Sequence, residues 1–312
     1  MLSRRAKLLY WMSRYLERSN FTSRLLITTS ELQLDLSLED EISWKPLLTV
    51  TNLNKDYIKL NKKYSEKKTI EYFILNKSNL SSIFNSLNLS QQNSLVIRDI
   101  LPEQSIIKLN DLILKFNKNI KTRKNKKNYI KILNEVIQGS QSFMYSTDME
   151  MQRNIEYQFL RLGRFIERTD MMIRILQSQS LRSKQHKKGY EYLTLEWINI
   201  LKSISAFQAY RQYSKQDITV SDIINFFLKA DIFPRSISWN LNQIERALYR
   251  ISKKNDLIKK IKYLNKKVEK FNIKNDDIDS LLLFLEKTLK EISELSYNIE
   301  KKYFFFKLKI KK

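Results

Sequence analysis

Apolar residues recur at steps of three and four along most of the chain. This spacing puts apolar side chains on one face of an α-helix, so it predicts helices. We expect the Lys-rich stretch 117–128 to be a loop between two of them. The predicted helices are, in order, residues 3–36, a stretch that starts near Pro46, 70–75, 80–95, 102–119, 129–144 and 148–181.

The C-terminal part carries a more regular seam of apolar residues. Alternating steps of four and three are the spacing by which two helices pack lengthwise. We therefore expect an antiparallel helical hairpin over residues 254–308. The seam residues are Leu257, Ile261, Leu264, Val268 and Phe271, followed after a polar break by Ile278, Leu282, Leu285, Leu289 and Ile292.

Part of the sequence recurs after about 150 residues. Three blocks match in the same order with a slowly growing offset, which indicates two related units that share a core. We expect one domain over 1–312, with a first repeat over about 1–128 and a second over about 148–250. The matched positions are Arg14, Glu17, Arg18 and Arg24 with Arg164, Glu167, Arg168 and Arg174; Trp44 and Leu48 with Trp197 and Leu201; and 72–74 and 82–83 with 226–228 and 236–237.

The composition supports an all-α fold of this kind. Only 3 Gly and 3 Pro occur in 312 residues, whereas a β-rich or α/β chain of this length needs many tight turns. Cysteine is absent, which excludes disulfides and thiol chemistry and fits a reducing cytoplasm. No stretch reaches the ~18 apolar residues of a membrane span, so we expect a soluble cytoplasmic protein.

A net charge of +24 raises the possibility of nucleic-acid binding. The surplus is mostly lysine, scattered among Asn and Ile over the whole chain, with few interleaved aromatics and no known nucleic-acid motif. A basic nucleic-acid-binding protein is therefore the third of our functional hypotheses.

The first helix, residues 3–36, is apolar nearly all round, which is typical of a buried helix and predicts that its charges are buried too. Arg14 precedes Glu17 by three residues, which is the less favourable order for a pair within one helix. We therefore expect tertiary partners: Glu17 with an arginine of the second copy, and Glu167 with one of the first. The planar guanidinium of Arg suits such pairing because it binds a carboxylate through two donors.

Two interpretations of this Arg/Glu cluster stay open. In one, a buried network holds the two units in register, which we call a structural lock. In the other, the surplus of arginine binds an anion, since the arginines of the second copy have only Glu167 and Asp170 near them on their helix. The candidate residues for either role are Arg14, Glu17, Arg18, Arg24, Arg161, Arg164, Glu167, Arg168 and Arg174.

Other chemistry has little support in the sequence. His186 is the only histidine, and it falls in a predicted polar linker. No Glu-x-x-His pair, phosphate-binding glycine loop or Ser-His-Asp set is present, so we predict no metal site, no cofactor and no recognisable catalytic centre.

Four blocks resemble the bacterial Alpha-E family of all-helical proteins with a Glu-Arg motif. They are Tyr-Trp-Met-Ser-Arg-Tyr-Leu-Glu-Arg at 10–18, Phe-Leu-Arg-Leu-Gly-Arg-Phe-Ile-Glu-Arg-Thr-Asp at 159–170, Ser-Ala-Phe-Gln-Ala-Tyr-Arg at 205–211 and Phe-Pro-Arg-Ser-Ile at 233–237. The resemblance covers about residues 1–250. It departs at 230–232 and 76–78, where an Asp-Arg-Glu-like run is expected and Ala-Asp-Ile and Asn-Lys-Ser stand instead.

The resemblance implies proteins encoded beside circularly permuted ATP-grasp ligases, often with transglutaminase-like proteins, and a role in synthesis or modification of small peptides. Our first hypothesis is therefore a non-catalytic partner or substrate-holding subunit of such a ligase. The second is a helical enzyme that uses Glu17 or Glu167 as a general base beside an Arg-bound anionic substrate.

Overall fold

The computed structural model describes residues 3–121, 126–185, 190–214, 218–253, 256–273 and 277–305. These residues form fourteen helices and no strand, which confirms the all-α class. None of the described helices has the length and apolar character to cross a membrane. The helices are α1 (Ser3–Asp35), α2 (Asp40–Val50), α3 (Asn54–Asn61), α4 (Glu66–Leu75), α5 (Ile83–Val96), α6 (Glu103–Lys121), α7 (Lys126–Glu150), α8 (Ile155–Gln185), α9 (Tyr190–Ser203), α10 (Phe207–Tyr213), α11 (Val220–Lys229), α12 (Ile237–Ile251), α13 (Asp256–Lys270) and α14 (Ile278–Tyr303).

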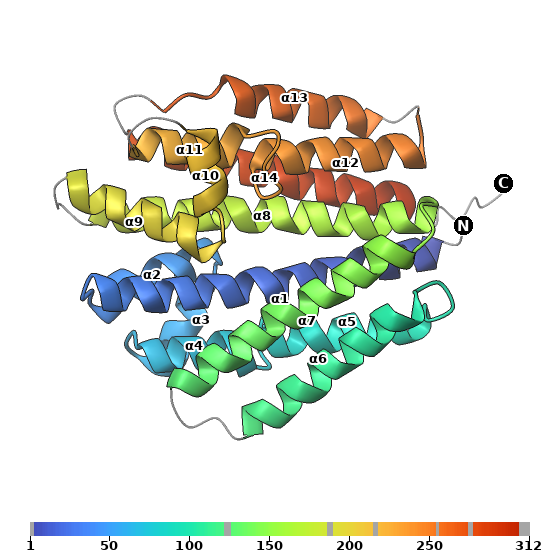
Figure 1. Ribbon diagram of the computed structural model, residues 1–312, viewed down its shortest axis with the longest axis horizontal. Coiled ribbons are helices and arrows are strands. Elements are labelled where there is room, and N and C mark those ends of the chain that lie inside the picture. The colour runs from blue at the N-terminus through green and yellow to red at the C-terminus, as the bar shows by residue number, and fades with distance from the viewer. Residues whose placement is uncertain are drawn as a thin grey trace.

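Two long helices, α1 and α8, form the centre of the molecule (Figure 1). They lie side by side and run in the same direction. On one side α5 and α7 pack on α1, and α6 packs on α7; on the other, α12 and α14 pack on α8. The short helix α2 crosses to α8, and α9 crosses to α1. Both central helices are therefore enclosed by other helices over most of their surface.

The positions matched in sequence occupy comparable places. Trp44 on α2 and Trp197 on α9 are both completely buried. Ser82 and Ser236 each cap a helix, α5 and α12, by accepting a hydrogen bond from the backbone amide three residues on. The internal duplication and the repeat boundaries themselves stay predictions from the sequence.

Two predicted boundaries are wrong. The break before α8 spans 151–154 rather than 145–147, because α7 continues to Glu150. Helices also extend into the Lys-rich stretch 117–128 from both sides, up to Lys121 and from Lys126. Lysine is a good helix former, so a run of lysines does not by itself end a helix.

The last two helices contact each other but have other main neighbours. Phe271 stacks on Phe284 with ring centroids 4.0 Å apart, and Lys267 of α13 pairs with Glu291 of α14. However, α13 packs most extensively on α12, and α14 on α8. A self-contained C-terminal hairpin therefore stays a prediction.

Gly163 sets how closely α1 and α8 approach. A β-carbon on this residue would overlap the backbone oxygen of Tyr10 and the hydroxyl of Ser13 on α1. Ser13 itself donates its hydroxyl to the carbonyl of Tyr10, which satisfies that oxygen at the crossing. The backbones can meet here because Gly163 has no side chain and Ser13 has a small one. This contact fixes the register in which the charged residues one turn further along face each other.

We predict that Gly163→Ala lowers the free energy of unfolding by about 2 kcal/mol or more, because the new methyl group meets backbone that cannot rotate away. Gly139→Ala on α7 is the matched control. Its β-carbon would come within 2.7 Å of Cδ1 and 2.9 Å of Cβ of Leu112, which are side-chain rather than backbone atoms, and alanine gains about 1 kcal/mol of helix propensity over glycine. Urea unfolding followed by circular dichroism measures both variants. Equal stability of the two would contradict the role assigned to Gly163.

Candidate functional site

Ionised side chains lie inside the interface between α1 and α8. The exposed fraction is 9% for Arg14, 3% for Glu17, 5% for Arg164 and 1% for Glu167. Burial of an isolated charge costs several kcal/mol, so each of these groups needs a partner of opposite charge. Arg24 is buried as well, whereas Arg18, Arg161, Arg168 and Arg174 are half-buried, so the expected burial holds for part of the cluster.

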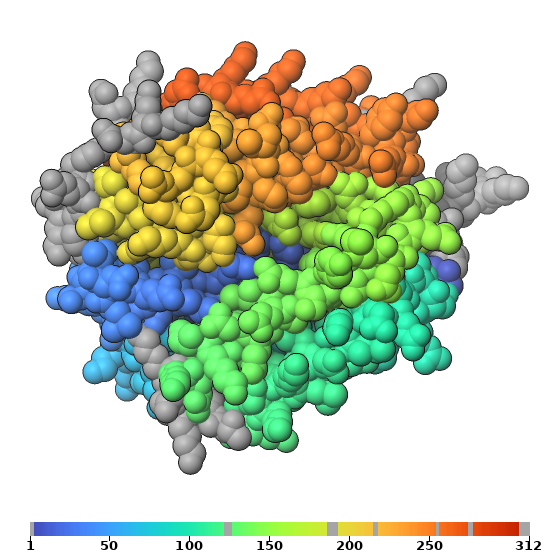
Figure 2. Space-filling view, in the orientation of Figure 1, coloured from blue at the N-terminus to red at the C-terminus, as the bar shows by residue number. Residues whose placement is uncertain are grey.

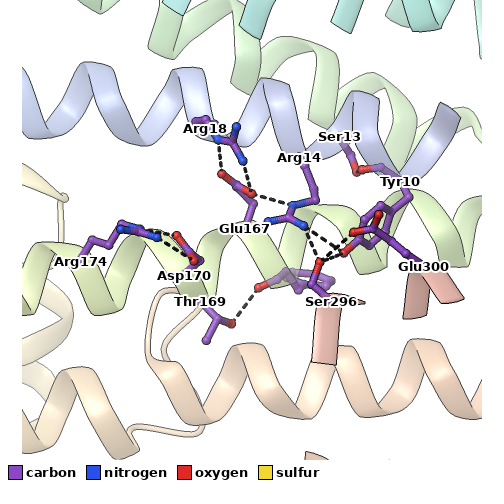
Figure 3. Close-up of polar contacts among 11 residues, drawn as sticks. Tyr10, Ser13, Arg14, Arg18, Glu167, Thr169, Asp170, Arg174, Ser296 and Glu300 are labelled. Carbon is purple, nitrogen blue, oxygen red and sulfur yellow. Dashed lines mark hydrogen bonds and ion pairs between the residues drawn. The ribbon is translucent and has the colours of Figure 1, made fainter. Parts of the chain in front are cut away.

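Glu167 receives two arginines from the opposite helix (Figure 3). Arg14 donates its Nε to Oε2 at 2.7 Å, and Arg18 donates its Nε to Oε1 at 2.5 Å and an Nη to Oε2 at 3.1 Å. Both carboxylate oxygens are therefore used. We call Glu167, Arg14 and Arg18 the Glu167 cluster.

Helix α14 covers one side of the Glu167 cluster. Arg14 donates to the hydroxyl of Ser296 at 2.6 Å and to the hydroxyl of Tyr10 at 3.2 Å, and those two hydroxyls share a hydrogen bond of 2.8 Å. The Nε and one Nη of Arg14 thus donate to protein groups.

Burial by itself would raise the pKa of Glu167, but the nearby charges of Arg18 and Arg14 and their hydrogen bonds outweigh it. Together they lower the pKa of this carboxyl from 4.5 to about 2. Glu167 is therefore ionised at neutral pH and is a weak base. Its geometry fits a structural lock better than general-base chemistry.

The reciprocal pair opens onto a cavity. Arg168 of α8 donates its Nε to Oε1 of Glu17 at 2.6 Å. Each glutamate is thus paired with an arginine of the other helix, as the sequence predicts. Glu17 and Arg168 line a cavity of about 380 Å³, whose charged lining residues are Glu17, Asp148, Arg161, Arg164, Arg168 and Arg235. We call it the arginine cavity.

Arg164, which matches Arg14 in sequence, does not bind the glutamate of the opposite helix. It donates two hydrogen bonds, of 2.7 and 2.9 Å, to the carboxylate of Asp148 at the end of α7. Burial would raise the pKa of Asp148, but Arg164 and Tyr157 outweigh it and hold this pKa below its ordinary value. The Nε of Arg164 is buried and has no hydrogen-bond partner among the described residues.

Two arginines of the arginine cavity have only neutral partners among the described residues. Arg161 donates to the side-chain oxygens of Gln158 at 3.2 Å and Gln243 at 2.5 Å. Arg235 donates to the backbone oxygen of Ile204 at 2.7 Å. Burial, together with the charges of Arg24 and Arg168, lowers the pKa of Arg235 to about 10. Burial also lowers the pKa of Arg161.

One further arginine, near Arg235, also has no carboxylate partner among the described residues. Arg24 donates its Nε to the amide oxygen of Asn20 at 3.1 Å. Its sequence counterpart Arg174 donates its Nε at 2.6 Å to a carboxylate, Asp170, which matches Asn20. Because position 20 holds an amide where the second copy has a carboxylate, this side of the interface carries one negative charge fewer than the other. Burial lowers the pKa of Arg24, and the nearby Glu17 only partly offsets this.

Helices α1, α7, α8 and α12 with the segment before it form the walls of the arginine cavity. In Figure 2 a strip of α1 (dark blue) is set back between α7 (green) and the orange segments. Aromatic rings provide the apolar part of the lining, above all Phe165 and Trp239, which meet edge to face with centroids 5.5 Å apart.

The structure divides the nine candidate residues into three places. Arg14, Arg18 and Glu167 form the Glu167 cluster. Arg174 pairs with Asp170 away from the arginine cavity. Glu17, Arg161, Arg164 and Arg168 line that cavity, and Arg24 lies close to it.

Sequence reasoning missed Asp148, Trp239 and Arg235. Arg235 carried a signal, since it stands in the Phe-Pro-Arg-Ser-Ile block at 233–237. Asp148 carried none, because the wrong boundary put it at the start of α8 instead of the end of α7. His186 lies outside the described residues.

A family model described as a predicted alpha-helical domain with a conserved ER motif, Alpha-E, matches residues 1–304. The chain belongs to the Alpha-E family. The match includes α13 and α14, so the Alpha-E domain extends beyond residue 250, where the resemblance read from the sequence ended. Comparison with curated proteins and with solved structures returns no match.

We predict that acid unfolding exposes the contribution of Glu167. A carboxyl whose pKa is lowered in the folded state adds stability above its unfolded pKa and loses it as the pH falls through the folded value. Between about pH 4.5 and 2, wild type should lose about 3 kcal/mol through this group, at about 1.4 kcal/mol per pKa unit.

Glu167→Gln should have a lower free energy of unfolding than wild type at neutral pH. This difference should become smaller as the pH falls from about 4.5 to 2. The exposed residue Glu39 provides a control, and Glu39→Gln should follow the wild-type curve. Urea unfolding at stepped pH measures all three proteins. If the difference in free energy of unfolding between wild type and Glu167→Gln stayed constant over this pH range, the charge of the Glu167 carboxylate would not be the source of the stability.

Proposed function

We propose that this Alpha-E protein is a non-catalytic, substrate-holding subunit that binds an anionic ligand in the arginine cavity. The observation that carries the proposal is the excess of buried or half-buried arginine there. Four arginines and two carboxylates line the cavity, and both carboxylates are already engaged by Arg168 and Arg164.

An anion would relieve an unfavourable arrangement of charges. Arg235 is half-buried and lies near the cations Arg24 and Arg168, whose charges Glu17 only partly offsets. Repulsion and desolvation both disfavour this arrangement unless a negative group enters. Arginine is also the residue best suited to carboxylates and phosphates, because its donors form a planar fork.

The lining residues support holding rather than chemistry. The described lining contains no serine, threonine, cysteine, lysine or histidine. Its possible nucleophiles are Glu17, Asp148 and Tyr157, and these are engaged with Arg168, Arg164 and Asp148 respectively. The described residues also hold no group of three or more His, Asp and Glu side chains placed to bind a metal ion. We therefore assign the bond-forming step to a partner.

The partner that we propose is a circularly permuted ATP-grasp ligase, with a transglutaminase-like protein as a further associate. The support is the family context that the resemblance implies. The ligase would supply the nucleotide chemistry for synthesis or modification of small peptides, and the helical protein would present the anionic substrate.

A second candidate is an enzyme that uses Glu17 as a general base, since Glu17 is the glutamate of the two that lines the arginine cavity. Glu17→Gln distinguishes the two candidates. It should leave anion binding in place if the protein only holds its substrate, and it should abolish turnover if Glu17 is the base.

We expect inorganic phosphate to raise the melting temperature of wild type relative to chloride at equal ionic strength. Saturation at about 100 times the dissociation constant corresponds to about 2.7 kcal/mol of added stability. Arg235→Gln and Arg161→Gln should lose most of this shift. Arg98→Gln, which removes the same charge from an exposed position, should keep it.

A complementary variant adds charge instead of removing it. Asn20→Asp places a carboxylate beside Arg24, as Asp170 lies beside Arg174. It should weaken phosphate binding. Because Asn20 also donates its amide to the backbone oxygen of Ile137 at 3.2 Å, a donor that Asp lacks, urea unfolding must show that the variant is folded. Equal phosphate shifts in wild type, the cavity variants and Arg98→Gln would mean that the arginine cavity is not the anion site.

We also expect the purified protein to co-elute with an ATP-grasp ligase from the same genome in size-exclusion chromatography. Arg235→Gln should co-elute equally well, because the mutation alters the cavity and not the outer surface. Separate elution of the two proteins at micromolar concentration, with and without ATP, would refute the partnership and leave the anion site untouched.

A further inference from the structure

The two uncompensated arginines of the arginine cavity lie in different surroundings. Arg161 sits on α8 beside Gln158 and Gln243, and the cations that act on it are Arg164 and Arg250. Arg235 lies in the segment between α11 and α12, and the cations that act on it are Arg24 and Arg168. The cavity therefore has two separate cationic groups rather than one.

Helix geometry sets the separation of the two groups. Arg161 and Arg168 are seven residues apart on α8, which is about 10.5 Å along the helix axis at 1.5 Å per residue. Arg235 lies at the Arg168 end, because Arg168 donates to the carbonyl of the adjacent Pro234 at 3.4 Å. Arg161 is thus at one end of the arginine cavity, and Arg168 and Arg235 are at the other.

Between the two ends lie aromatic rings and the guanidinium of Arg164, which is paired with Asp148 and whose carbon is 5.8 Å from the centroid of Phe165. Phe165 lies between Arg161 and Arg168 on α8, with its ring centroid 5.4 Å and 5.6 Å from their guanidinium carbons. The ring of Trp239 meets Phe165 edge to face and lines the same cavity. An apolar spacer could pack on these two rings, because removal of apolar surface from water is favourable.

The formal charge of the lining indicates how many negative groups are needed. Arg164 is matched by Asp148 and Arg168 by Glu17, which leaves Arg161 and Arg235, a formal surplus of two positive charges. A single carboxylate could satisfy one end only. The other end would keep a half-buried cation whose hydrogen-bond partners are all neutral, which is unfavourable.

We infer that the arginine cavity binds a ligand with two anionic groups joined by an apolar spacer. One anionic group binds Arg161, the other binds Arg235 and Arg168, and the spacer packs on Phe165 and Trp239. A cavity of about 380 Å³ is large enough for such a small molecule. This inference rests on the proposed function, since it names the class of substrate held at the same site.

The test compares ligands that differ only in their second anionic group and its distance. Isothermal titration calorimetry at fixed ionic strength uses butyrate as the monoacid and the series malonate, succinate, glutarate, adipate and pimelate. Carboxylates and phosphates both suit arginine, so the corresponding terminal diphosphonates form a second arm. We expect one spacer length to bind at least tenfold more tightly than butyrate, with weaker binding on either side of it.

The variants then locate the two ends. Arg161→Gln should reduce the best diacid to the affinity of butyrate while butyrate itself still binds. Arg98→Gln should retain the full preference. Trp239 provides an independent readout. Its fluorescence should change with the best diacid, and the change should be absent in Trp239→Phe.

Affinity that rises only with total charge, without an optimal spacer length, would overturn the inference. Equal affinity for butyrate and all the diacids would also overturn the inference, but it would leave the proposed anion site supported. Failure of phosphate, monoacid and diacid alike would instead refute the proposed function. The length series on wild type needs no variant, so it decides the question even if a variant fails to fold.

Discussion

Two glutamates are buried where the helices α1 and α8 cross, and every other feature of the site follows from the need to pair them. A carboxylate in such surroundings is tolerated only with cationic hydrogen-bond donors close by. Glu167 takes Arg14 and Arg18 from α1, and Glu17 takes Arg168 from α8. Each helix therefore supplies the arginines that neutralise the glutamate of the other. The close contact at Gly163 sets the register in which they meet.

The two halves of this arrangement are chemically unequal. At Glu167 both oxygens are used, and α14 covers Arg14 through Ser296. On the other side Arg164, which matches Arg14 in sequence, binds Asp148 instead of Glu17. The arginine cavity lies beside Glu17 and its partner Arg168. An amide at Asn20, in place of an acid, increases the positive surplus on this side. One half thus has the closed contacts expected of a structural lock, and the other half has the arginines that we propose bind an anion.

Much of this could be predicted from residue patterns, but not all of it. The nearly all-round apolar character of α1 predicted the burial of Arg14 and Glu17, and the unfavourable order of that pair predicted partners on another helix. Both inferences rest on patterns within one helix and on the cost of burying an unpaired charge, which is several kcal/mol. The two interpretations of the cluster, lock or anion site, could not be separated, because they depend on which arginine reaches which carboxylate.

The missed parts are contacts between segments distant in sequence. Asp148 reaches Arg164 only because α7 continues to Glu150, and Arg235 reaches the cavity from a segment with little regular pattern of its own. The role of Gly163 depends on the distance between two backbones, which no pattern along a single helix reports.

The most direct test of this account is a double-mutant cycle on Glu17 and Arg168. Unfolding free energies of wild type, Glu17→Gln, Arg168→Gln and the double variant give the interaction energy across the crossing of α1 and α8. Directly contacting residues in a buried network couple by about 0.5–3 kcal/mol, and we expect more than about 1 kcal/mol here. Additive effects would mean that the pair does not hold the two helices together, and would contradict the account.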